Sequence, residues 1–160
     1  LLGSAISAGP HRLTIAGHMS VPQMVSIGCY DLIDFVGWQP MPEAFRHTPA
    51  HAHNRLLTSV VQTAEQRRAM AAEICAKLAN AAGPVTFFLP TKGGNEWDRP
   101  GGPLSDPEAL AAFCDEMQRL CPPNVELVTL DSHINDPEFS DSVLARFDAW
   151  VAAGIIAAPQ

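Results

Sequence analysis

Four short stretches of the chain are dominated by apolar and β-branched residues, and we predict a strand in each. They cover residues 23–29, 56–61, 85–89 and 125–130. The stretches at 56–61 and 85–89 are almost continuously apolar, which is typical of strands covered on both faces. Prolines border three of the four stretches, as expected where a strand begins or ends.

Amphipathic patterns between and after these stretches predict helices at 63–82, 106–120 and 136–153, and a short one at 11–19. Thr63 is a candidate N-cap. The sequence Asp-Pro-Glu opens both of the last two helices, with Asp as cap, Pro in the first turn and Glu favourable to the helix dipole. We therefore interpret Asp136 as a helix N-cap.

The alternation of strands and helices predicts an α/β fold, with a mostly parallel sheet, right-handed crossovers and helices on both faces. Ligands of such sheets bind at the carboxyl ends of the strands. The loops at 28–49, 90–105 and 131–136 should therefore meet at that edge. The first two are longer than usual connections, which favours a functional or interface role.

Composition narrows the class of protein. The chain has 160 residues, 47% hydrophobic and 17% charged, which fits one globular domain. Its net charge of −7 argues against nucleic-acid or anionic-membrane partners, and no apolar run is long enough to span a bilayer. The four cysteines form no CxxC pair and are expected to be reduced and mostly buried, which predicts a cytoplasmic protein. The chain lacks an initiator Met, which suggests a fragment or a processed chain.

The loop after the third predicted strand is rich in glycine and carries Lys92. This lysine and the backbone N–H groups near Gly93 and Gly94 could hold a phosphate or a carboxylate. The loop matches neither GxxxxGK[ST] nor GxGxxG. The alternative is a long surface loop ordered by Trp97.

Polar residues also follow the last predicted strand. Asp131, His133 and Asn135 alternate there and could position a ligand, act as a general base or bind a metal. Alternatively, His133 is a hydrogen-bonded structural residue. After the first strand, Asp31 lies closest to the strand end and is a candidate site residue, whereas Asp34 fits capping or solvent exposure better.

A third polar cluster contains His47, His51 and His53, followed by Asn54. Its spacing could gather imidazoles around zinc, but Pro49 interrupts any helix, so we expect no metal. We interpret His53 and Asn54 as groups that fix the loop by hydrogen bonding. No GxSxG motif occurs, which makes nucleophilic catalysis the weaker hypothesis.

Four segments together resemble a known family. VPQMVSIGCYDLIDF (21–35), AHNRLLTSVV (52–61), FLPTKGGNEWDRPGGPLSDPEA (88–109) and DSHINDPEF (131–139) occur in the family's order. They are similar to the C-terminal half of the uncharacterised ATP-binding-domain family that includes the tomato mosaic virus resistance protein. Positions matched to the family's motifs are Asp31, His53, Asn54, Lys92, Gly93, Asp98, Gly101, Gly102, His133, Asn135 and Asp136. Arg55 and Val61 depart from it, where the family is expected to have Pro and Arg.

The resemblance implies a Rossmann-like three-layer sandwich that works with an N-terminal domain. It divides this chain into a linker and helix at 1–20, the Rossmann-like domain at 21–154 and a tail at 155–160. It also implies ATP with Mg as a cofactor, a homo-oligomer (a homodimer), and in some bacteria a TIM-barrel partner protein.

Three functional hypotheses follow. The first is a ligand-binding domain of a two-part, ATP-binding-type protein. The second is an enzyme, a hydrolase or transferase, that acts on a small anionic substrate with Asp31, Lys92 and His133 at the sheet edge. The third is a protein-interaction module whose long loops contact a partner.

Overall fold

The computed structural model describes residues 3–157, and its centre is a three-stranded parallel sheet. Strands β1 (Gln23–Val25), β5 (Val85–Pro90) and β6 (Val125–Leu130) lie in the order β1-β5-β6. Every residue of β5 is buried, which agrees with its continuously apolar sequence. The predicted strands at 85–89 and 125–130 are confirmed, and the first predicted strand is shorter than expected.

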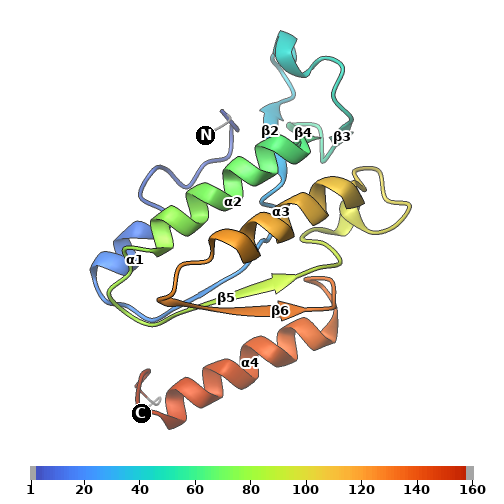
Figure 1. The fold of residues 1–160 in the computed structure, drawn as a ribbon. Coiled ribbons are helices and arrows are strands. Elements are labelled where there is room, and N and C mark those ends of the chain that lie inside the picture. The colour runs from blue at the N-terminus through green and yellow to red at the C-terminus, as the bar shows by residue number, and fades with distance from the viewer. Residues whose placement is uncertain (1–2, 158–160) are drawn as a thin grey trace.

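A second sheet is antiparallel and was not expected. It contains β2 (Leu32–Val36), β4 (Leu57–Val61) and β3 (Ala50–Ala52) in the order β2-β4-β3. The prediction that residues 56–61 join the parallel sheet was therefore wrong, as was the prediction of an unbroken loop at 28–49. Figure 1 shows this sheet beyond the carboxyl ends of β5 and β6, next to the start of α2 (Ala64–Leu78).

The polar residue in the middle of β2 explains why this sheet was missed. Asp34 interrupts an apolar run and suggests a loop when read alone. In the structure, its carboxylate accepts a hydrogen bond from Ser59 Oγ on the paired strand β4, at 2.7 Å. The backbone N–H of Asp34 donates to Ser4 Oγ at 3.0 Å. Cross-strand hydrogen bonding thus satisfies a residue that we had interpreted as a cap or an exposed side chain.

Helices cover both faces of the parallel sheet. Figure 1 shows α2 and α3 (Pro107–Leu120) on one face and α4 (Pro137–Ala152) on the other. The short helix α1 (Thr14–His18) lies near the end of α2. The α/β class with a mainly parallel sheet is therefore confirmed. Two short 3₁₀ turns, Glu43–Phe45 and Glu96–Asp98, lie in the long loops.

The starts of the three long helices match the predictions to within one residue, as do the ends of α3 and α4. Thr63 forms a capping box with Gln66, and Asp106 accepts a hydrogen bond from Ala109 N at 3.0 Å. The helix predicted at 63–82 ends earlier, at Leu78, because the chain turns there to reach β5. The predicted helix at 11–19 is reduced to α1.

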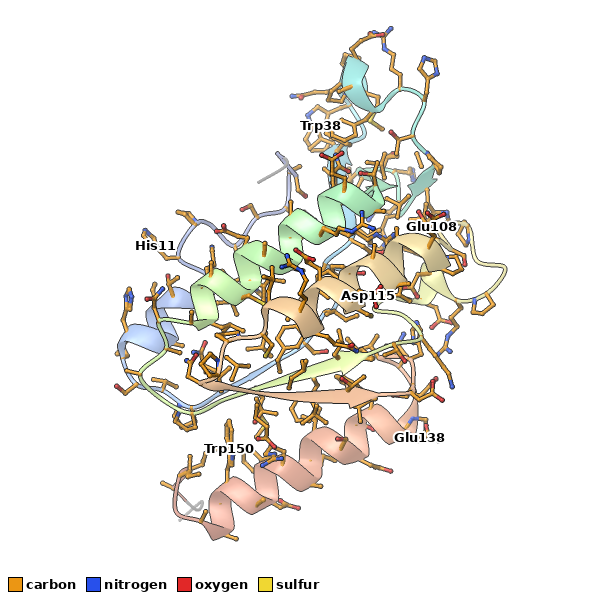
Figure 2. All side chains as sticks on the ribbon, in the orientation of Figure 1. His11, Trp38, Glu108, Asp115, Glu138 and Trp150 are labelled. Atoms are coloured by element: carbon orange, nitrogen blue, oxygen red, sulfur yellow. The ribbon has the colours of Figure 1, made fainter. Side chains whose placement is uncertain are left out.

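The main core lies between β5 and helices α2 and α3. Its most buried members include Phe87, Leu89, Phe113 and Met117, all at most 1% exposed. On the opposite face, Figure 2 shows Trp150 between α4 and the sheet, and this side chain is only 6% exposed. No helix within residues 3–157 is long and apolar enough to cross a membrane. All four cysteines are free thiols, and Cys29 is exposed.

Replacement of Phe113 tests this core. Phe113→Ala should lower the free energy of unfolding by about 3–5 kcal/mol, because it removes a fully buried aromatic ring and leaves a cavity. Chemical denaturation monitored by circular dichroism measures the change. Leu144→Ala on the exposed side of α4 is the control and should change stability by less than about 1 kcal/mol. Equal losses in the two variants would contradict the assignment of the core.

Candidate anion-binding site

A pocket of about 340 Å³ opens at the carboxyl edge of the parallel sheet. Three cationic side chains line it: Arg67 from the first turn of α2, Lys92 after β5, and Arg99 after the second 3₁₀ turn. The N-terminus of α3, at Pro107, forms another wall. Figure 1 shows that α3 and α4 both begin at this edge, as expected for a parallel α/β sheet.

The acidic side chains at the pocket already have partners. Asp98 contacts His133, Asp106 accepts a hydrogen bond from a backbone N–H of α3, and Asp136 pairs with Arg99 at 3.2 Å. These bonds hold the carboxylates in place but leave their negative charge, so the attraction of the pocket for an anion depends on where its cations lie rather than on their number.

Arg67 is the most unusual residue of the pocket, because its side chain is only 1% exposed. Its Nε donates to Gln62 O at 3.1 Å, and its Nη1 donates to Tyr30 Oη at 3.4 Å. Its Nη2 lies 3.4 Å from Asp31 Oδ2 but has no hydrogen-bond acceptor among the described residues. A buried guanidinium with an unused donor is costly unless an anion or water completes it.

Asp31 lies behind Arg67 and is fully buried. Asn95 Nδ2 donates to both of its carboxylate oxygens, at 3.0 and 3.3 Å. Burial raises the pKa of Asp31 above its usual value, and the positive charge of Arg67 opposes that shift. Asp31 thus joins the turn before β2 to the glycine-rich loop.

His133 and Asp98 form a second buried pair in the same network. His133 Nε2 lies 2.9 Å from Asp98 Oδ1 and 3.0 Å from Asn95 O, while Nδ1 accepts a hydrogen bond from Asn135 N at 3.1 Å. This geometry corresponds to the tautomer with its proton on Nε2. Since both ring nitrogens already have partners and the side chain is 1% exposed, His133 fits the structural role better than that of a general base.

A more exposed layer of charged groups surrounds this network. Glu96 accepts hydrogen bonds from Asn135 Nδ2 and Arg99 Nε, both at 3.1 Å, and these bonds lower the pKa of Glu96. Lys92 Nζ pairs with Asp131 Oδ2 at 3.1 Å. Lys92 lines the pocket, whereas Asp131 is 87% exposed and lies outside it.

Asp136 occupies the N-cap position of α4, but its side chain does not cap the helix. Its Oδ2 instead accepts a hydrogen bond from His133 N at 2.8 Å, and its Oδ1 accepts one from Arg99. The hydrogen bond from His133 N, together with Arg99, lowers the pKa of Asp136. The prediction that Asp136 is the N-cap residue of α4 is therefore confirmed, but its carboxylate turns back toward the strand end instead of capping the helix.

Three glycines allow the loop after β5 to pack closely against neighbouring residues. A Cβ at Gly93 would collide with Asp98 Oδ1 and lie 2.6 Å from His133 Cδ2, and one at Gly94 would lie 2.8 Å from Ile27 O. A Cβ at Gly102 would collide with Trp97 O, whereas one at Gly101 would meet nothing within 4 Å. The absence of a side chain at Gly93, Gly94 and Gly102 therefore lets the loop approach its neighbours.

Two histidines of the third polar cluster pack against Trp97 of the glycine-rich loop. The rings of His51 and His53 lie 4.8 and 5.1 Å from the Trp97 ring, centroid to centroid. Asn54 Oδ1 accepts hydrogen bonds from Leu56 N and Leu57 N, which fixes the turn before β4. Within residues 3–157, no three His, Cys, Asp or Glu side chains gather as metal ligands.

Sequence reasoning missed Arg67, although a signal was present. The buried positions of α2 are Arg67, Ala71, Cys75 and Leu78, so the arginine lies on the helix's inward row. A charged residue on that row requires a buried partner, which is Asp31. Asn95 was also missed, because its role depends on a contact 64 residues away in the sequence.

The fold and the site together define an α/β domain with a pocket at its strand ends that is lined by Arg67, Lys92 and Arg99. Residues 1–151 match the model of the C-terminal domain of the uncharacterised protein family UPF0261, and the chain belongs to that family.

Relatives in bacteria and in a plant support this membership. The chain is 49% identical to a UPF0261 protein of Brucella melitensis over 96% of its own length and 37% of the relative's. It is 33% identical to one from Mesorhizobium japonicum, over 92% of this chain and 38% of that protein. It is 29% identical to the ToMV resistance protein Tm-1(GCR237) of Solanum lycopersicum, over 92% of this chain and 20% of that protein. The chain thus spans well under half the length of these relatives.

Substitution of Gly93 tests the close packing of the loop. Gly93→Ala should lower the free energy of unfolding by about 3 kcal/mol or more, because φ is +131° and the new methyl group displaces Asp98 and His133. Gly101→Ala, at φ +82° in open space, is the matched control and should cost only about 1–2 kcal/mol. Urea denaturation of both variants measures the difference. A Gly93 variant as stable as the Gly101 variant would contradict the described packing.

Proposed function

We propose that this domain binds a small anionic ligand through a phosphate or carboxylate group in the pocket at the carboxyl edge of the parallel sheet. The observation that carries the proposal is Arg67, which is buried, lines the pocket and has an unused Nη2 donor. A planar guanidinium suits such oxyanions because it donates several hydrogen bonds in a fixed geometry. Lys92 and the N-terminus of α3 add positive potential around the same space, whereas Arg99 is already paired with Glu96 and Asp136.

A nucleotide is the form of ligand that the family resemblance favours. We propose that ATP with Mg binds at least partly here, in a Rossmann-like three-layer sandwich that works with the additional region of the longer relatives. The placement of the pocket at the strand ends supports this proposal. Of the residues first considered, Lys92 and the loop that contains Gly93, Gly94, Gly101 and Gly102 remain the candidate phosphate-binding elements. Asp98 and His133 hold that loop in place.

The enzyme hypothesis has less support. His133 has both ring nitrogens engaged, and Asp31 is separated from solvent by Arg67 and Asn95. A general base needs access to the proton that it removes, and neither group has it in this geometry. Binding without turnover is therefore the function that the site supports best.

The projecting antiparallel sheet supports a role in protein contacts as well. Trp38 follows β2 and is 68% exposed, and Leu56 precedes β4 and is 60% exposed. Figure 2 shows Trp38 beyond the end of β2, away from the parallel sheet. Contiguous exposed apolar patches mark interaction surfaces, and the hydrogen bond from Gly37 N to Leu56 O brings the segments that carry Trp38 and Leu56 together. Because the chain covers only 37% of the Brucella melitensis relative, we propose that the additional N-terminal region of the longer protein packs here.

Calorimetric titration tests the proposed ligand class. Sulfate, phosphate and ATP with magnesium should each be titrated into the chain, alone and joined to the additional region of a relative. Arg67→Gln should weaken binding by roughly tenfold or more, because a charge-assisted hydrogen bond is lost. Lys92→Gln, at a more exposed position, should weaken it by only a few-fold.

Arg68→Gln is the matched control, since Arg68 is the exposed neighbour of Arg67 on α2. It removes the same charge and should leave the affinity within about twofold of the wild type. Absence of binding for every anion in both forms of the protein, or equal binding by the Arg67 and Arg68 variants, would refute the proposal.

A further inference from the structure

Arg67 contacts the buried carboxylate of Asp31 and also lines the pocket. Its Nε and Nη1 are committed to Gln62 O and Tyr30 Oη, so Nη2 is the group that remains. This Nη2 lies 3.4 Å from Asp31 Oδ2, and the same side chain lines the pocket. An anion that binds to Nη2 therefore competes with Asp31 for the same positive group.

The guanidinium of Arg67 stabilises the charged form of Asp31. The carboxylate is fully buried, and its hydrogen bonds come from the neutral amide of Asn95. Among the described residues, Arg67 is the one cation paired with it. Burial raises the pKa of Asp31, so its charged form already lacks solvent support.

The other groups around Asp31 do not replace the arginine. Asp98, in the loop after β5, adds negative charge and raises the pKa of Asp31 further. Cys29 and Tyr30, on the same turn, both have raised pKa values and stay neutral. His133, which follows β6, faces Asp98 rather than Asp31. An anion that pairs with the guanidinium of Arg67 thus leaves the carboxylate of Asp31 without a cation paired to it alone.

We propose that Asp31 is a specificity-determining residue that competes with the ligand for Arg67 and takes up a proton when an anion binds. This inference rests on the proposed anion-binding function. The bound anion pairs with Arg67 and adds negative charge near Asp31. The pKa of Asp31 is therefore higher in the complex than in the free protein. The affinity therefore falls as the pH rises through the interval between these two pKa values, and is constant outside it.

Proton uptake by Asp31 also limits how much negative charge the ligand can place at the buried end of the pocket. One proton offsets one entering negative charge, so the buried end of the pocket matches a single oxyanion group, such as a carboxylate or one phosphoryl group. Further negative charge on the ligand must lie toward Lys92, which is 56% exposed, and Arg99 at the mouth of the pocket. The favoured ligand is therefore elongated, with one anionic head group bound deep in the pocket.

The test uses sulfate as the probe, because its own charge does not change near neutral pH. Titration calorimetry over a range of pH, in pairs of buffers with different ionisation enthalpies, gives the number of protons taken up. The wild-type chain should take up as much as one proton, and its affinity should change by at most about tenfold per pH unit. Difference infrared spectra should show the carbonyl stretch of a newly protonated carboxylic acid when sulfate binds, which protonation of a histidine would not produce.

Two variants separate Asp31 from the other charges. Asp31→Asn should bind sulfate without proton uptake, and above the pH interval it should bind several-fold more tightly than the wild type, because nothing competes for Arg67. Asp131→Asn, which removes the same charge beside Lys92 at an 87% exposed position, should keep the uptake. Thermal unfolding should confirm that both variants are folded.

The outcomes distinguish the two proposals. If the wild type binds no sulfate, phosphate or ATP, the proposed function itself is refuted. If sulfate binds without proton uptake and without the carboxylic-acid band, the competition at Arg67 is refuted while anion binding stands. Uptake that persists in Asp31→Asn would likewise overturn the role of Asp31.

Discussion

Asp98 gathers the hydrogen bonds on which the carboxyl edge of the sheet depends. Its carboxylate accepts from Gly94 N at 2.7 Å, from Asn95 N at 3.2 Å and from His133 Nε2 at 2.9 Å. It is 8% exposed, so these bonds form where water cannot substitute for them. One side chain thereby fixes the glycine-rich loop against the end of β6 and shapes the wall of the pocket.

Asn95 connects Asp98 to the buried pair of Asp31 and Arg67. Its side-chain Nδ2 donates to Asp31, and its side-chain Oδ1 accepts a hydrogen bond from Trp97 N at 3.0 Å. Its backbone carbonyl oxygen lies 3.0 Å from His133 Nε2. The antiparallel sheet, the loop after β5 and the end of β6 thus share one buried polar network. Such networks favour a single arrangement, because each partly satisfied alternative leaves a buried polar group without a partner.

The sequence predicted the parallel sheet because β5 and β6 carry their own apolar signal and their own bordering prolines. It could not predict the antiparallel sheet, since β3 is short and the hydrogen-bond partners of Asp34 in β2, Ser4 and Ser59, lie far from it along the chain. The glycine-rich loop and His133 were correctly placed at the sheet edge by topology. Their mutual contacts depend on side-chain orientation, which periodicity does not give. Arg67 stood on the inward row of a predicted helix and could have been inferred from that position.

The separation of the site's partners along the chain has a kinetic consequence. Asp31 meets Asn95 across 64 residues, and Asp98 meets His133 across 35. Contacts of such long range close late in folding, because their loop entropy is recovered only when the elements between them are in place. A partly folded chain therefore has no pocket, and any ligand bound there stabilises the completed native state alone. Under the proposed anion-binding function, a higher concentration of the anion would slow proteolysis of the finished domain.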